Sequence, residues 1–131
     1  MTNIATETAI RTAHMTIPNG DLQIDAYLAQ PLAEGTFPGV IVIQEIFGVN
    51  IHIREVTQRL AQEGYVAIAP AIFQRIAPGF EAAYTPEDIQ IGRKYKEQTK
   101  ADELLSDIQA AICRRQQRSY RLSQNSAKCE W

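Results

Sequence analysis

The sequence predicts an α/β fold with a mostly parallel sheet and an antiparallel N-terminal edge. Residues 14–29 fall into two strand-like stretches around a turn-type cluster, as the strands of a hairpin do. Two short apolar runs, at 39–44 and 65–70, are typical of buried strands, and a stretch with helical spacing separates them. A strand, a helix and a strand in this order predict a parallel βαβ unit.

The hairpin at the N-terminal edge is expected from two strands and the turn between them. The strands are predicted at residues 14–17 and 22–29. Residues 18–21 are Pro-Asn-Gly-Asp, a cluster that joins hairpin strands. We assign the preceding residues 1–13 to an N-terminal extension.

A central buried strand is predicted over residues 39–44, because the run from Val40 to Ile43 is unbroken Val and Ile. Glu45 comes soon after this run, and a charge is tolerated only where a strand leaves the core. In open parallel sheets, ligands bind in the crevice beyond the carboxyl ends of the strands. Glu45 is therefore a candidate site residue, and the alternative is a solvated loop acid.

Helices are expected in three places. One covers residues 51–63, where Asn50 is a suitable N-cap and Gly64 ends the pattern. A second begins near Pro86, after a capping threonine and with two acids in its first turn. A third covers residues 101–112 and is expected to pack on the sheet through an apolar face. That face consists of Leu104, Leu105, Ile108, Ala111 and Ile112.

Composition and charge are those of one ordinary globular domain, with 131 residues, 45% hydrophobic residues and a net charge of -2. This charge gives no electrostatic basis for binding nucleic acid or an anionic membrane, so a small-molecule partner is expected. No apolar stretch approaches the roughly 20 residues that span a bilayer, and we expect a cytoplasmic protein. Cys113 and Cys129 have the spacing of neither a disulfide framework nor a metal site, and no metal or cofactor is expected.

The character of the sequence changes at Cys113. Residues 113–131 have almost no apolar periodicity and carry five basic side chains against one acidic one. We interpret them as a polar basic tail that is not native to the domain of residues 14–112, as a shifted reading frame would produce. A nucleic-acid-binding tail is the alternative. A domain without its remaining strands leaves an uncovered sheet edge, through which self-association is expected.

Four blocks of this sequence resemble the dienelactone hydrolase family, α/β-hydrolases typified by carboxymethylenebutenolidase. The blocks are Gln44-Glu45-Ile46-Phe47-Gly48-Val49-Asn50, His52-Ile53-Arg54-Glu55, Arg59-Leu60-Ala61 and Gly64-Tyr65-Val66-Ala67-Ile68-Ala69-Pro70. The resemblance covers roughly residues 14–112 and implies the N-terminal part of an α/β-hydrolase fold. The function it implies is hydrolysis of lactone or ester bonds in small carboxylated substrates, by acyl transfer to a cysteine nucleophile and without a cofactor.

The resemblance carries over one part of the catalytic site. Glu45 matches the acid that takes part in forming the reactive thiolate, and the backbone N–H of Ile46 matches one oxyanion-hole donor. In the family the nucleophile lies in Gly-x-Cys-x-Gly, followed by an Asp and a His, and none of the three can be assigned here. We therefore expect a truncated, inactive hydrolase, with a non-catalytic α/β fragment or binding domain as the alternative.

Substrate binding in the family uses an Arg and a Tyr from the segment that matches residues 84–96. Tyr95 fits the Tyr, whereas Ile91 stands where the Arg belongs, and Arg93 is the nearest substitute for recognition of a carboxylate. Arg54 lies close enough to the turn after Glu45 to reach a ligand. A nucleotide-binding domain is a weaker alternative, because no Gly-rich phosphate loop follows either predicted strand.

Overall fold

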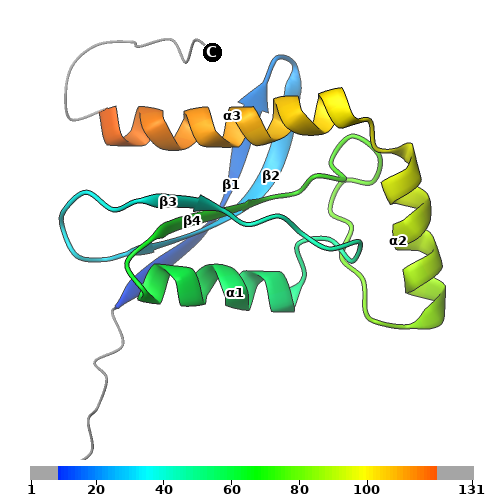
Figure 1. Cartoon of the computed structure of the whole chain (residues 1–131), viewed down its shortest axis with the longest axis horizontal. Helices are drawn as coiled ribbons and strands as arrows, with labels where there is room; N and C mark the ends of the chain where they lie inside the picture. Colours follow the sequence, from blue (N-terminus) through cyan, green and yellow to red (C-terminus); the bar gives the residue numbers. More distant parts are fainter. Residues whose placement is uncertain (1–8, 121–131) are drawn as a thin grey trace, which may run out of the picture.

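The structure is a computed structural model that describes residues 9–120, with side chains described through Cys113. The described strands form one sheet in the order β1-β2-β4-β3, and helices cover it (Figure 1). The strands are β1 (Ile10–Asn19), β2 (Leu22–Pro31), β3 (Gly39–Ile41) and β4 (Val66–Pro70), and the helices are α1 (Ile51–Gln62), α2 (Pro86–Gln98) and α3 (Ala101–Tyr120).

The N-terminal hairpin is confirmed. β1 and β2 pair antiparallel, with Ile17 opposite Ile24, and both of these side chains are fully buried. The turn contains Gly20 with a φ of 60°, a left-handed conformation that glycine adopts readily. β1 begins at Ile10, so residues 10–13 of the predicted extension belong to the sheet.

The parallel βαβ unit is also confirmed, because β3 and β4 pair parallel and α1 connects them. The predicted central position of β3 is wrong, since β4 lies between β2 and β3 and β3 is the edge of the described sheet. β3 ends at Ile41, and Ile43 is 46% exposed. β2 pairs antiparallel with both β1 and β4, so the described sheet is mixed rather than mostly parallel.

Two apolar cores lie on the two faces of the sheet. Figure 1 shows α1 on one face and α3 on the other. Side chains alternate along β4, so that Ala67 and Ala69 belong to the cluster that includes Ile53 of α1, whereas Ile68 belongs to the cluster that includes Ala111 of α3. Beyond the carboxyl ends of β3 and β4 the chain runs toward the side of the molecule where α2 lies (Figure 1).

α3 packs on the sheet as predicted, but part of its expected face is wrong. Ala111 is fully buried, whereas Leu105 is 66% exposed and Asp107 is buried instead. Asp107 and Ala111 are four residues apart and share a helix face, and Arg75 pairs with the Asp107 carboxylate, which allows this acid to be buried. The backbone of α3 continues past Cys113 to Tyr120. Within residues 9–120, no helix is both long and apolar enough to cross a membrane.

Candidate functional site

The candidate site is the turn formed by residues 45–50, which connects the end of the β3 run to α1. Val42 still pairs with β4, through a hydrogen bond from its N–H to the carbonyl of Ile68 at 2.8 Å. The chain then leaves the sheet, and the N–H of Gly48 donates to the carbonyl of Glu45 at 3.3 Å. The turn therefore lies beyond the carboxyl end of a parallel strand pair, where the sequence places Glu45.

Glu45 is exposed in this structure. No hydrogen bond or ion pair engages its carboxylate among the described residues, whereas its carbonyl is held by Gly48. The backbone at Glu45 is thus fixed while its side chain is available. A carboxylate in this state can accept a proton or a hydrogen bond from a group that comes from outside the described residues.

Ile46 follows Glu45 and is half-buried. Within the described part of the chain, its backbone N–H has no hydrogen-bond partner. Its carbonyl group packs against α2 at Gly92, where an added Cβ would lie 2.4 Å from the Ile46 oxygen and 3.1 Å from the carbonyl carbon. α2 therefore touches the peptide next to the predicted oxyanion donor, and only a glycine permits this distance.

Gly48 holds the turn against the segment of residues 80–84. A Cβ at Gly48 would lie 2.1 Å from the carbonyl oxygen of Phe80, and the φ of Gly48 is 80°. Gly48 forms a β-bridge with Glu81, and the N–H of Ala82 donates to the carbonyl of Phe47 at 3.0 Å. Both steric space and backbone conformation therefore require glycine at position 48.

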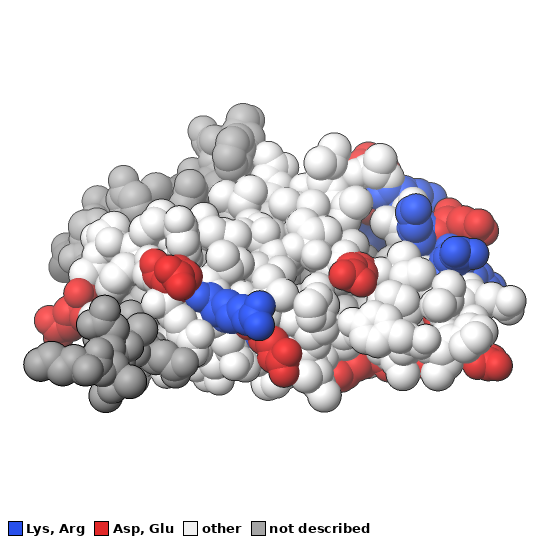
Figure 2. Space-filling view, turned by 60° about the horizontal axis from the view of Figure 1, so that its bottom comes forward, with Lys and Arg blue, Asp and Glu red and all other residues white. Residues whose placement is uncertain are grey.

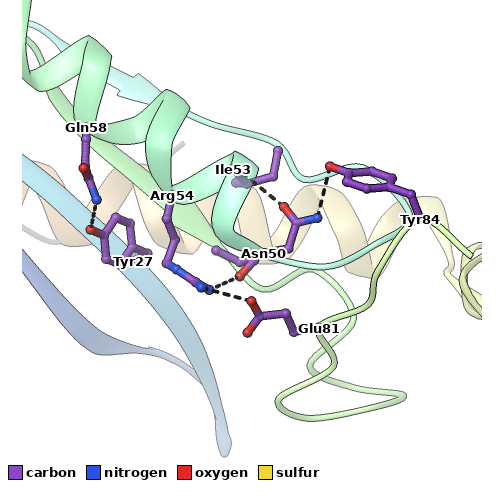
Figure 3. Close-up of polar contacts among 8 residues, drawn as sticks. Tyr27, Asn50, Ile53, Arg54, Gln58, Glu81 and Tyr84 are labelled. Carbon is purple, nitrogen blue, oxygen red and sulfur yellow. Dashed lines mark hydrogen bonds and ion pairs between the residues drawn. The ribbon is translucent and has the colours of Figure 1, made fainter. Parts of the chain in front are cut away.

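Arg54, a predicted substrate-binding residue, has its guanidinium engaged within the protein. Nη1 donates to the carbonyl of Val49 at 2.7 Å, and Nη2 pairs with Oε1 of Glu81 at 3.0 Å (Figure 3). These contacts join α1, the turn and the 80–84 segment. Arg54 therefore supports the turn, and it would have to release Glu81 before it could bind the carboxylate of a substrate.

Asn50 joins the same three parts of the molecule. Its Oδ1 accepts a hydrogen bond from the N–H of Ile53 at 3.1 Å, which confirms it as the N-cap of α1. Its Nδ2 donates to the hydroxyl of Tyr84 at 3.3 Å, and the rings of Tyr84 and Phe47 form a T-shaped pair with centroids 4.5 Å apart. Figure 3 shows Tyr84 and Glu81 approaching the turn from the same loop.

Tyr95 and Arg93, the other predicted substrate-binding residues, lie on α2 beside Gly92. Tyr95 is half-buried, and its ring forms T-shaped pairs with Phe80 and Phe73, with ring centroids 4.9 and 5.9 Å apart. Arg93 is exposed. Figure 2 shows Lys and Arg side chains gathered toward the end of the molecule where Figure 1 places α2, with Asp and Glu beside them. Both residues therefore lie on the helix that contacts the turn through Gly92. Arg93 is open to solvent, whereas the ring of Tyr95 is packed against other aromatic rings.

Several residues that hold the site were not predicted from the sequence. Gly92, Glu81 and Tyr84 act through contacts that are distant along the chain, and no local pattern signals them. The sequence does contain an indication for Gln44, because a polar residue between the apolar run and Glu45 is expected to have a specific hydrogen-bonding role. Its side chain is buried and makes two hydrogen bonds, to Ile72 and to the carbonyl of Glu45.

Cys113 lies on α3 and is not part of this turn. Cys129 lies outside the described residues, so the expectation drawn from the spacing of the two cysteines stays a prediction. No group of three or more His, Cys, Asp or Glu side chains within residues 9–113 is arranged to hold a metal ion.

Comparisons with known proteins agree on one family. The model of the dienelactone hydrolase family matches residues 24–126, which extends into the segment 113–131. A "Putative carboxymethylenebutenolidase" of Synechocystis is 66% identical over 103 residues, which are 79% of this chain and 42% of that protein. A protein of the same description from Methylorubrum extorquens is 36% identical over 112 residues, or 85% of this chain and 38% of that protein.

Solved structures show the same similarity. A crystal structure described as a "Putative Dienelactone Hydrolase" from Klebsiella pneumoniae is 38% identical and superposes with a TM-score of 0.68, over 79% of this chain and 42% of that one. The chain therefore spans about 42% of the length of the Synechocystis and Klebsiella proteins that it matches. Because the family model covers well over half of the 131 residues, the chain belongs to the dienelactone hydrolase family.

Proposed function

We propose that this chain contributes the first half of an active site that hydrolyses lactone or ester bonds in small carboxylated substrates. The observation that carries the proposal is the 45–50 turn, where a carboxylate and a backbone N–H follow one another on a firmly held backbone and neither has a partner among the described residues. Glu45 is assigned to thiol activation and the N–H of Ile46 to the oxyanion hole, as the family resemblance implies.

The reaction follows from these two groups and a cysteine. Glu45 accepts the proton of the thiol, and the resulting thiolate attacks the acyl carbon of the substrate. Negative charge develops on the acyl oxygen, which the Ile46 N–H stabilises by a hydrogen bond. The C–O bond then breaks, and the departing alkoxide or enolate takes up the proton that Glu45 received. Water then adds to the thioester, which gives the carboxylic acid and restores the thiol.

The carboxylate of the substrate would be bound from the α2 side. Arg93 is an exposed cation next to the contact between Gly92 and Ile46, and Tyr95 lies one helical turn from Gly92. Arg54 is the third proposed contact, in competition with Glu81. The charge pattern that disfavours nucleic acid and membrane surfaces as partners supports a small molecule.

The cysteine nucleophile would come from outside these 131 residues. The sequence holds no Gly-x-Cys-x-Gly, and Cys113 lies on a helix rather than at a strand-to-helix turn. We therefore propose that the chain alone does not turn over substrate, and that the uncovered edge of β3 promotes self-association. Exposed Ile43 near that edge supports the second point. The cytoplasmic location stays a prediction that cell fractionation checks.

An esterase assay tests the proposed function. The purified chain is incubated with a dienelactone or a p-nitrophenyl ester, alone and together with a polypeptide that spans the remaining length of the Synechocystis relative. We expect turnover only in the mixture, and we expect iodoacetamide to abolish it. Thiol-sensitive turnover by the chain alone would contradict the assignment of the nucleophile, and an inactive but assembled mixture would support the alternative of a non-catalytic binding domain.

A further inference from the structure

Gln44 precedes the acid of the turn, and only 7% of this residue is exposed. Its side-chain amide makes two hydrogen bonds. Oε1 accepts from the N–H of Ile72 at 3.0 Å, and Nε2 donates to the carbonyl oxygen of Glu45 at 3.1 Å. Because the Ile72 N–H can only donate, this contact fixes which end of the Gln44 amide faces the Glu45 carbonyl.

The carbonyl of Glu45 and the N–H of Ile46 belong to one peptide group. A trans peptide is planar, so its N–H points in the opposite direction to its C=O. The Glu45 oxygen accepts hydrogen bonds from Gln44 at 3.1 Å and from the Gly48 N–H at 3.3 Å. These two donors on the carbonyl side therefore set the direction of the Ile46 N–H on the other side.

We infer that Gln44 is a positioning residue, which orients the Glu45–Ile46 peptide so that the Ile46 N–H is held ready as an oxyanion donor. The consequence for catalysis rests on the proposed function. An oxyanion hole is effective because its donors are oriented before charge develops. A hydrogen bond to the carbonyl also polarises the peptide, which strengthens its N–H as a donor. Gln44 does this without touching the substrate.

NMR spectroscopy of the chain tests the inference directly, through the ¹⁵N shift of Ile46 and the carbonyl ¹³C shift of Glu45. The test variant is Gln44→Glu, whose carboxylate still accepts from Ile72 and cannot donate to Glu45. The control is Gln58→Glu on α1, where Nε2 of Gln58 donates to the Tyr27 hydroxyl at 2.7 Å (Figure 3). We expect both signals to move in Gln44→Glu at neutral pH and to stay in place in the control.

Acidification should reverse the shift changes in Gln44→Glu, a result that a merely structural role of Gln44 does not predict. Burial raises the pKa of an introduced carboxyl group, and once protonated it is a hydrogen-bond donor again. The Ile46 and Glu45 signals of Gln44→Glu should therefore return toward those of the unaltered chain as the pH falls. Signals that do not move in the folded variant, or that move and do not return, would overturn the inference.

The unaltered chain decides the question if Gln44→Glu does not fold. A buried, hydrogen-bonded amide predicts that the side-chain N–H₂ protons of Gln44 exchange with water about tenfold more slowly than those of exposed Gln98. Equal rates would overturn the inference. None of these measurements uses turnover, so a failed esterase assay would defeat the proposed function and leave this result standing.

Discussion

Two corners of the molecule are held by opposite kinds of contact. At the corner where α3 meets the hairpin, Asp107 is buried and its carboxylate accepts from Nε and Nη2 of Arg75 at 3.0 and 2.9 Å and from Asn19 at 2.8 Å. Arg75 also pairs with Glu103 at 3.0 Å. The 45–50 turn is held mainly by close backbone contacts at glycines and by hydrogen bonds between neutral groups. The carboxylate of Glu45 has no partner among the described residues.

The difference shows how to distinguish a structural charge from a candidate catalytic one. At the α3 corner each charge has a partner, and the acid is buried because the partners compensate for lost hydration. At the turn the backbone is fixed and one acid stays exposed, which is an arrangement that leaves a group free to react. Arg54 resembles the first kind, since Glu81 and Val49 already engage it.

The largest effect is expected at the α3 corner. Asp107→Ala should lower the free energy of unfolding by about 3 kcal/mol, because it leaves Arg75 and Asn19 without their shared acceptor. Urea denaturation measures the loss, with the exposed Asp102→Ala as the control, for which less than about 0.5 kcal/mol is expected. Equal losses would show that the buried Asp107 carboxylate and its hydrogen bonds contribute nothing specific.

The contribution of Asp107 and Arg75 to the free energy of unfolding has a defined pH dependence. The hydrogen bond to Asp107 raises the pKa of the Arg75 guanidinium above its ordinary high value. A raised pKa contributes stability that is fully present below the ordinary pKa and is lost only above the raised one. The loss caused by Asp107→Ala should therefore be the same at pH 7 and at pH 9.

A somewhat smaller loss in the free energy of unfolding is expected for Gly48→Ala. A left-handed conformation costs a side chain about 1–2 kcal/mol, and contact with the Phe80 oxygen adds about 1 kcal/mol or more. Gly20→Ala is a matched control, because Gly20 also has a positive φ and no atom within 4 Å of the added Cβ. If both variants lose the same free energy in urea denaturation, the turn does not pack on the 80–84 segment as described.

Gly92→Ala tests the contact between α2 and the turn, because the sign of the change in the free energy of unfolding depends on whether that contact exists. In a helix that has room, replacing glycine by alanine stabilises by about 1 kcal/mol. Here the added Cβ would lie 2.4 Å from the Ile46 oxygen, and we expect a net loss of about 1 kcal/mol. A rise in thermal stability would show that α2 does not press on the Ile46 peptide.

The smallest effect is expected for the ion pair of Arg54 and Glu81. Both side chains are partly exposed, at 24% and 45%, and such pairs contribute about 0.2–1 kcal/mol. A double-mutant cycle with Glu81→Gln and Arg54→Met isolates the coupling energy. A coupling above about 2 kcal/mol would place this pair with the α3 corner rather than with the turn.

The sequence predicts those parts of the molecule that depend on local patterns. Capping at Asn50 and Thr85, the hairpin turn and the βαβ order all follow from residues that are near one another, and the structure confirms them. The position of β3 in the sheet does not follow, because the order of strands depends on pairing between distant segments. An apolar run predicts burial, but Ile43 is exposed where the described sheet ends.

The candidate site divides in the same way. Glu45 and Ile46 could be proposed from the end of a strand and a family resemblance. The groups that hold them are Gly92, Phe80, Glu81 and Tyr84, which meet the turn only after folding. For the same reason the apolar pattern wrongly places Leu105 on the buried face of α3. The actual face includes Asp107, whose burial depends on Arg75 in a distant loop.

The central claim is that the exposed acid of the turn acts in catalysis. The most direct test is kcat/KM of the complemented protein with Glu45→Gln, compared with Glu55→Gln on an exposed position of α1. We predict that kcat/KM falls at least about 100-fold in Glu45→Gln while the free energy of unfolding is unchanged. In Glu55→Gln, kcat/KM should stay close to that of the unaltered protein. Equal kcat/KM values for the two variants would contradict the account.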